Sequence, residues 1–159
     1  MVNVNIKNID RLIQRFENVK TADLTPLVTK ATLIVEAQAK SLCPVNDGGL
    51  RMSIHAKVET KGVNIIGMVY TSKEYAMYVE FGTGIKGNGT YPYDVEGLTL
   101  EYKDTGWVYT PDGGDTFYYT EGMEAQPYMY PALHQNKDKI KKLINDGYTE
   151  LLRKSIGGG

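Results

Sequence analysis

The fold is decided by residues 52–71, which read Met52-Ser53-Ile54-His55-Ala56-Lys57-Val58-Glu59-Thr60, then Lys61-Gly62, then Val63-Asn64-Ile65-Ile66-Gly67-Met68-Val69-Tyr70-Thr71. In the first run polar and apolar side chains alternate, which is typical of a half-buried strand. The second run is apolar on both faces, which predicts a more central strand. Lys61-Gly62 predicts a hairpin turn between them. The stretch therefore predicts two antiparallel strands.

Two helices are predicted before this hairpin. Residues 5–19 carry an apolar stripe at spacings of three and four, formed by Ile6, Ile9, Ile13 and Phe16 and widened by Leu12 and Val19. A second helix over residues 26–42 begins at Pro26 behind a Thr25 cap. It ends before Pro44, because the proline ring and the missing N–H cannot continue the helix. A turn at residues 46–49 then leads into the first strand.

The segments after the hairpin are more varied. Residues 75–81 predict a short helix that Gly82-Thr83-Gly84 would stop. Residues 85–122 are rich in Gly, Tyr, Thr and Asp, with short strands expected at 95–100, 107–109 and 117–120. Pro131 opens a last helix, followed by a frayed tail at 155–159. The order predicts one α+β domain over residues 1–159, with a mainly antiparallel sheet packed against two or three helices and a long β or loop insertion at 85–123.

Composition narrows the function classes. The chain has 159 residues, of which 42% are hydrophobic and 23% charged, as expected of one globular domain. The net charge of -1 argues against attraction of the whole chain to nucleic acid or to an anionic membrane. No apolar run approaches the roughly 18 residues of a membrane-spanning helix, and the first residues lack the pattern of a signal peptide. A single cysteine, Cys43, makes a reducing compartment the simpler expectation.

Charge and aromatic residues are unevenly distributed along the chain. Residues 61–125 carry 4 basic and 10 acidic residues, whereas residues 126–159 carry 6 basic and 3 acidic ones. This asymmetry suits head-to-tail self-association, although an ordinary solvated surface is the alternative. Eleven of the twelve tyrosines lie between Tyr70 and Tyr130, where they either form an interface or fill the core of a sheet. The candidate interface residues are Tyr91, Tyr93, Trp107, Tyr109, Phe117 and Tyr118.

Three patterns resemble catalytic or metal sites, and each has a simpler interpretation. Pro92-x-Asp94 and Glu101-x-Lys103 resemble the carboxylates and lysine of magnesium-dependent nucleases, but such a pattern arises easily in an acidic loop. Asp112-Gly113-Gly114-Asp115 lacks the regular oxygen ligands of an EF-hand, and a plain turn is favoured. Cys43 with His55 or His134 is better explained by a buried inert thiol. No catalytic, metal-binding or cofactor-binding residue is therefore predicted.

Three further segments, in this order, resemble one family of phage proteins. They are Cys43-Pro44-Val45-Asn46-Asp47-Gly48-Gly49-Leu50-Arg51-Met52-Ser53-Ile54, Tyr75-Ala76-Met77-Tyr78-Val79-Glu80-Phe81-Gly82-Thr83-Gly84 and Gln126-Pro127-Tyr128-Met129-Tyr130-Pro131-Ala132-Leu133. Together they are similar to the HK97-type gene-product-ten family of tailed-phage neck and tail-completion proteins. The resemblance covers residues 20–84 and 124–155. The sequence departs from the family at Asn46-Asp47, where Asp-Thr is usual, and in the long segment 85–123.

The motif residues make physical sense as scaffold. They are Pro44, Gly48, Leu50, Arg51, Ile54, Tyr75, Tyr78, Glu80, Phe81, Gly82, Thr83, Gln126, Pro127 and Pro131. Gly48 permits a turn that a Cβ would disfavour, after which Leu50 and Ile54 are expected to enter the sheet. Arg51 and Glu80 are charges inside apolar motifs, so each is expected to pair within the subunit or across to a neighbour.

The resemblance implies a structural virion protein without enzymatic activity or cofactor. Such proteins form rings, typically hexameric, at the junction of capsid and tail. The implied partners are copies of the same chain, head-completion or connector proteins, and a tail terminator or tail tube protein. DNA would pass through the lumen without specific binding, and no membrane is involved. The protein would be assembled in the cytoplasm of the host bacterium and reside in the virion neck.

Other functions are kept as alternatives. Within the same class, the chain could be a tail terminator that caps the tail tube. From other classes, it could be a small carbohydrate-binding module that uses Trp107 and the tyrosines, or the magnesium-dependent nuclease with Asp94 and Glu101.

Overall fold

The structure is a computed structural model that describes residues 23–157. The predicted helix over residues 5–19 lies outside the described residues. The α+β class is confirmed. The helices are α2 (Thr25–Leu42), α3 (Gly49–Met52), α4 (Ala76–Phe81), α5 (Gly84–Gly87) and α6 (Met129–Gly157), with a 3₁₀ turn at Pro111–Gly113. The strands are β1 (Ile54–Lys61), β2 (Asn64–Thr71), β3 (Trp107–Tyr109) and β4 (Tyr118–Thr120).

The predicted hairpin is present. β1 and β2 pair antiparallel from Ile54 opposite Thr71 to Lys61 opposite Asn64. The prediction that β2 is central is wrong, because in the described part of the chain this sheet has two strands. The apolar residues on the second face of β2, Ile66 and Tyr70, are therefore exposed.

The start of β1 also differs from the prediction. The expected strand begins at Met52, but Gly49–Met52 form the single helical turn α3 and β1 begins at Ile54. Gly48 has a φ of 83°, the left-handed conformation that glycine adopts readily, so the predicted role of this glycine in a turn is confirmed. Leu50 consequently packs from α3 instead of from the sheet, whereas Ile54 enters the sheet as predicted.

Helix α2 matches its predicted range closely. It ends at Leu42, before Pro44, as expected. Thr25 is its first residue and not its cap. Asp23 instead accepts a hydrogen bond from the N–H of Thr25, at 2.9 Å, and so satisfies one amide of the first turn. The side chain of Thr25, together with this backbone hydrogen bond, lowers the pKa of the Asp23 carboxyl.

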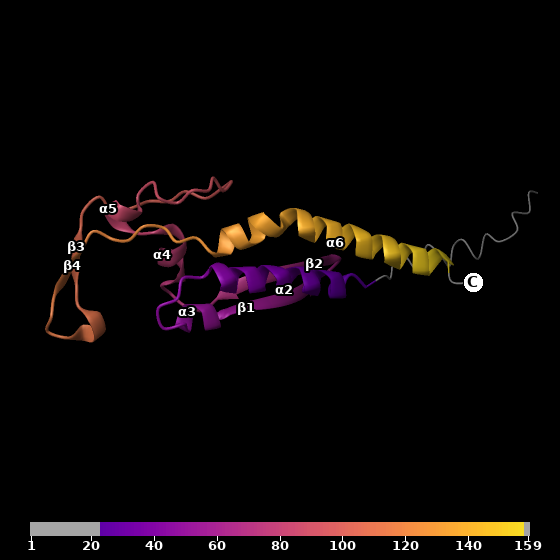
Figure 1. The fold of residues 1–159 in the computed structure, drawn as a ribbon, viewed down its shortest axis with the longest axis horizontal. Coiled ribbons are helices and arrows are strands. Elements are labelled where there is room, and N and C mark those ends of the chain that lie inside the picture. Colours follow the sequence, from indigo (N-terminus) through magenta and orange to yellow (C-terminus); the bar gives the residue numbers. More distant parts are fainter. Residues whose placement is uncertain (1–22, 158–159) are drawn as a thin grey trace, which may run out of the picture.

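The helices and the hairpin are arranged in layers. α2 contacts both strands of the hairpin and also packs along α6 (Figure 1). α6 begins at Met129, before the predicted Pro131, and continues to Gly157, where a frayed tail was expected. Gly147 allows close packing of α6 on α2, since a Cβ there would overlap the side chain of Leu27.

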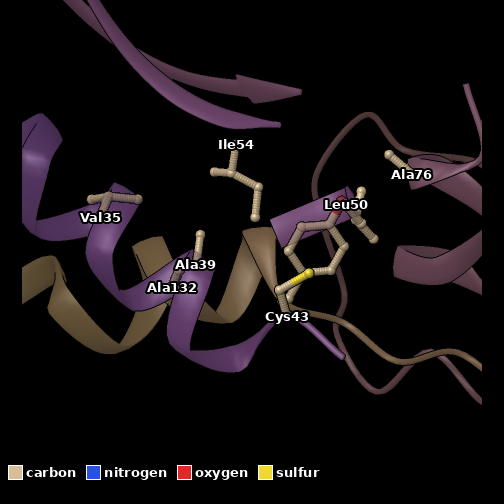
Figure 2. Packing of buried hydrophobic residues seen from close by; sticks show 8 residues of the cluster. Val35, Ala39, Cys43, Leu50, Ile54, Ala76 and Ala132 are labelled. Carbon is tan, nitrogen blue, oxygen red and sulfur yellow. The ribbon is translucent and has the colours of Figure 1, made fainter. Parts of the chain in front are cut away.

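The core lies where the two long helices meet the hairpin and α4. Its fully buried cluster consists of Val35, Ala39, Cys43, Leu50, Ile54, Ala76, Tyr128 and Ala132. Figure 2 shows Ile54 pointing from β1 toward Ala39 of α2. Tyr128 and Ile54 are the largest fully buried side chains, so the segment before α6 is as important to the core as the hairpin.

We call residues 84–122 the arm, because they project beyond the end of the helical layers (Figure 1). The strands expected at 107–109 and 117–120 are present as β3 and β4, which pair antiparallel. The strand expected at 95–100 is absent. A turn replaces it, in which Leu98 N–H donates to the carbonyl of Val95 and Gly97 has a φ of 80°, a conformation that no strand contains.

Substitution of Gly67 tests the contact between β2 and α2. A Cβ at Gly67 would overlap the hydroxyl of Thr32, so we expect Gly67→Ala to lower the free energy of unfolding by about 1–3 kcal/mol. Urea unfolding measures this change. Gly114→Ala, where the nearest atom is 3.6 Å away, is the control. In a Thr32→Ala background the cost of Gly67→Ala should shrink, and an unchanged cost would contradict the contact.

Candidate interaction surface

A buried carboxylate joins α4 to the start of α6. Glu80 is 4% exposed, and its side chain accepts hydrogen bonds from the N–H groups of Tyr128, Met129 and Tyr130 at 2.7, 2.8 and 3.0 Å. These amides have no partners within the helix, because they belong to its first turn. The partial positive charge at the start of α6 also favours the carboxylate. Glu80 is thus a helix cap supplied by a distant segment of the chain.

Arg51 forms no ion pair within residues 23–157. Glu80 binds backbone amides, and the ion pairs found in residues 23–157 join lysines to glutamates only. Arg51 is exposed, and its Nη2 donates weakly to the carbonyl of Cys43, at 3.4 Å. The side chain of Arg51 is therefore accessible to solvent among the described residues.

The two ends of the arm are held together at its base. Thr83 and Met123 exchange backbone hydrogen bonds of 2.8 and 3.1 Å. The backbones cross closely, since a Cβ on Gly122 would overlap the carbonyl of Thr83. Gly122 also has a φ of 97°, which other residues rarely adopt. The arm is therefore a closed excursion that leaves α4 and returns toward α6 at one point.

A row of aromatic side chains connects the arm to α4 and to α6. Ring centroids are 5.0 Å apart for Phe81 and Tyr91, 5.6 Å for Tyr91 and Tyr93, and 4.9 Å for Tyr93 and Tyr130. Tyr130 then stacks on His134 of α6. Burial raises the pKa of Tyr91 to about 12. Tyr91 and Tyr93, which were predicted as interface residues, are thus half-buried and pack within the subunit.

The other predicted interface residues lie on the β3–β4 part of the arm. Tyr109, Phe117 and Tyr118 are exposed, and Phe117 reaches 74% exposure. The sequence analysis did not single out Val108 and Tyr119, which are also exposed there. Val108 follows Trp107 in β3, and Tyr119 follows Tyr118 in β4. These neighbouring positions in the sequence could have identified them as candidates. This end of the arm is an apolar surface in contact with solvent, which is the usual composition of a protein interface.

An apolar cleft of about 780 Å³ lies between α4 and the arm. Met77 and Tyr78 of α4 form one wall and are exposed. Tyr102 and Trp107 line the other wall, and Tyr102 donates to the carbonyl of Phe81 at 2.9 Å. The sequence analysis missed Tyr102, because the arm is irregular there and carries no periodic pattern.

The motif residues not yet described lie around this region. Pro44 and Gln126 line a shallow pocket together with Gly48 and Tyr75. The N–H of Gln126 donates to the carbonyl of Val79 at 2.8 Å. Pro127 is half-buried before α6, and Pro131 is buried in its first turn. Gly82 ends α4, as predicted.

The candidate catalytic residues lie in different parts of the structure: Glu101 lines the apolar cleft, Asp94 does not, and Cys43 lies in the core. Asp94 and Glu101 are exposed on the irregular part of the arm. Cys43 is buried in the core, and this burial raises the pKa of its thiol. Within residues 23–157, no three His, Cys, Asp or Glu side chains gather closely enough to hold a metal ion. No helix in the same range is long and apolar enough to cross a bilayer.

One family model matches the part of the chain that contains the hairpin, α2 and α4. Residues 7–82 match a family model described as "Bacteriophage HK97-gp10, putative tail-component". This match, which covers slightly less than half of the chain, supports the HK97 gp10-type family of phage tail-component proteins. No curated protein and no solved structure matches the chain.

Substitution of Glu80 should weaken the whole domain. We expect Glu80→Gln to lower the free energy of unfolding by about 2–3 kcal/mol, because an amide nitrogen would face N–H groups that now donate to a charged oxygen. Urea unfolding measures the loss. Glu74→Gln, at an exposed residue just before α4, is the matched control. Equal stability of the two variants would contradict the capping role.

Two half-buried tyrosines of the arm, Tyr91 and Tyr102, should respond in opposite directions. The hydroxyl of Tyr91 has no hydrogen-bond partner among the described residues, so Tyr91→Phe should raise the free energy of unfolding by about 1 kcal/mol. Tyr102→Phe removes a hydrogen bond and should lower it by about the same amount. Thermal unfolding measures both.

The raised pKa of Tyr91 adds a pH dependence. Its contribution to stability is complete below pH 10.0 and is lost as the pH rises toward about 12, because the unfolded chain releases this proton more readily. Tyr91→Phe should therefore lose less stability than the natural chain between pH 9 and pH 11. An identical pH dependence of the two chains would contradict this environment for Tyr91.

Proposed function

We propose that this phage tail-component protein forms a hexameric ring at the head–tail junction, which joins the tail to the capsid and lines the DNA channel. The observation that carries this proposal is the arm: a closed, projecting segment with exposed apolar residues at its end (Figure 1). A monomeric protein has little reason to expose such a surface. A ring gives it a partner in every neighbouring subunit.

The charges of the arm and of α6 support contact between successive subunits. Exposed acidic residues lie along the arm, at Asp94, Glu96, Glu101, Asp104 and Asp115. Exposed basic residues lie along α6, at Lys137, Lys139, Lys141, Lys142, Arg153 and Lys154. Because the two surfaces differ, the contact would be head-to-tail, and a head-to-tail contact closes into a ring when its rotation divides a full turn.

The affinity between subunits and their relative orientation would depend on different side chains. The apolar end of the arm supplies area that can be removed from water. The unlike charges favour one orientation over others and contribute little affinity at an exposed site. In such an arrangement, the basic residues of α6 take part in contacts between subunits and do not face the lumen of the ring. The lumen is then neutral or acidic, so DNA phosphates find few cations to bind and can pass through.

The remaining partners would lie above and below the ring. Head-completion or connector proteins would contact one face, and a tail terminator or tail tube protein would contact the other. The protein would be assembled in the host cytoplasm and remain in the neck of the virion. The single domain of residues 1–159 would then act as scaffold, with the segment 85–123 as its contact element.

Electron microscopy of particles made without this gene tests the proposal. We expect filled heads and separate tails of normal length, and added purified protein should restore joining. Tails of uncontrolled length would instead identify a tail terminator. Intact infectious particles would contradict both roles.

One substitution at the end of the arm separates folding from joining. We expect Phe117→Ser to leave the thermal midpoint within about 2 °C of the natural value, because the side chain is 74% exposed, and to reduce joining at least tenfold. Infectious titre after complementation measures joining. Val63→Ser, at a residue 98% exposed on the β1–β2 turn, is the control. Equal titres from the two variants would contradict the role of the arm.

A further inference from the structure

A second apolar groove lies on the helical layers, away from the arm. It has a volume of about 360 Å³ and runs between α2, β2 and α6. Its lining comes from Val28 and Val35 of α2, Val69 of β2, and Leu133 and Ile144 of α6. Leu133 is 54% exposed, although it lies on the side of α6 that faces this groove. Residues 23–157 therefore leave an apolar surface uncovered beside the core.

The chain enters α2 at one end of this groove. α2 and α6 are antiparallel, since Gln38 contacts Gln135 and Leu27 lies against Gly147. Asp23 lines a small pocket together with Glu150 of α6, beyond the groove end at Ile144. Asp23, the first described residue, therefore lies near the Ile144 end of the groove.

We propose that residues 5–19 of the same chain form a helix that fills this groove. Their apolar stripe, which contains Ile6, Ile9, Ile13 and Phe16, supplies the face that the groove needs. Residues 20–24 are enough to turn the chain back on itself, because antiparallel helices are commonly joined by two to eight residues. The family match also begins within this segment, at residue 7.

The lengths of the segment and the groove agree. In a helix, residues 6–19 span roughly 20 Å, and α6 from Leu133 to Ile144 spans roughly 17 Å. The segment would run antiparallel to α2 and so parallel to α6. Val19 would then lie near Ile144, Ile13 near Ile140, and Ile6 near Leu133. The basic residues Lys7, Arg11 and Arg15 would point to solvent on the opposite side of the helix.

Disulfide trapping in the full-length chain tests the position and its register. All variants carry Cys43→Ala, which removes the native thiol. Oxidation of Ile13→Cys/Ile140→Cys should join positions 13 and 140 within one chain, detected by a faster monomer on a non-reducing gel and by mass spectrometry of the digest. Arg11→Cys/Ile140→Cys, with the first cysteine on the solvent face, is the matched control and should react at least tenfold less.

The other results would overturn the proposal. A disulfide-linked dimer would show that the groove takes the segment of a neighbouring copy. Equal reaction of both pairs, or of neither, would show that the segment lies elsewhere.

A stability measurement keeps the proposal testable if a cysteine variant does not fold. Ile13→Lys places a charge in the groove and should lower the thermal midpoint by about 5–10 °C. Gln14→Lys introduces the same charge on the polar side and should change it by less than about 2 °C. Equal midpoints for the two variants would contradict docking of residues 5–19.

Discussion

The domain depends on the carboxylate of Glu80. A buried charge is costly unless its partners are complete, and here three amides and the positive end of a long helix provide them. The same contact fixes α4 against the start of α6 and places Tyr128 in the core. The second and third family segments, which are 42 residues apart in the sequence, thus form one joint. Their shared role is structural, because they hold the arm in place relative to the helices.

Periodicity was sufficient to predict the regular part of this domain. The hairpin, α2, the short helix α4 and the last helix follow from patterns of two or of three and four, so the α+β class could be stated in advance. The predictions of secondary structure are wrong where a turn residue interrupts a periodic pattern, or where a strand lacks the neighbour that its apolar face suggested. Residues 49–52 form a helical turn, Gly97 replaces a strand by a turn, and the apolar second face of β2 is exposed instead of central.

The residues of the candidate interaction surface were harder to predict from the sequence. The sequence indicated an aromatic cluster, but it could not separate the rings that pack inside, Tyr91 and Tyr93, from those that face solvent, such as Phe117 and Tyr118. That separation depends on where the arm folds back over α4, which no local pattern encodes. Arg51 and Glu80 were noticed as charges inside apolar motifs, but the partners of Glu80 are backbone amides, which carry no sequence signature.

The closed base of the arm has a consequence for how this protein can evolve. Because the chain leaves and returns at the hydrogen bonds between Thr83 and Met123, residues can be inserted or deleted in the β3–β4 part of the arm, beyond the tyrosines that pack on α4 and α6, without altering the helical layers. The entropic cost is small, since doubling the length of a loop costs only about 0.6 kcal/mol. The outer part of the arm can therefore change in length and sequence as a separate module while the scaffold remains the same.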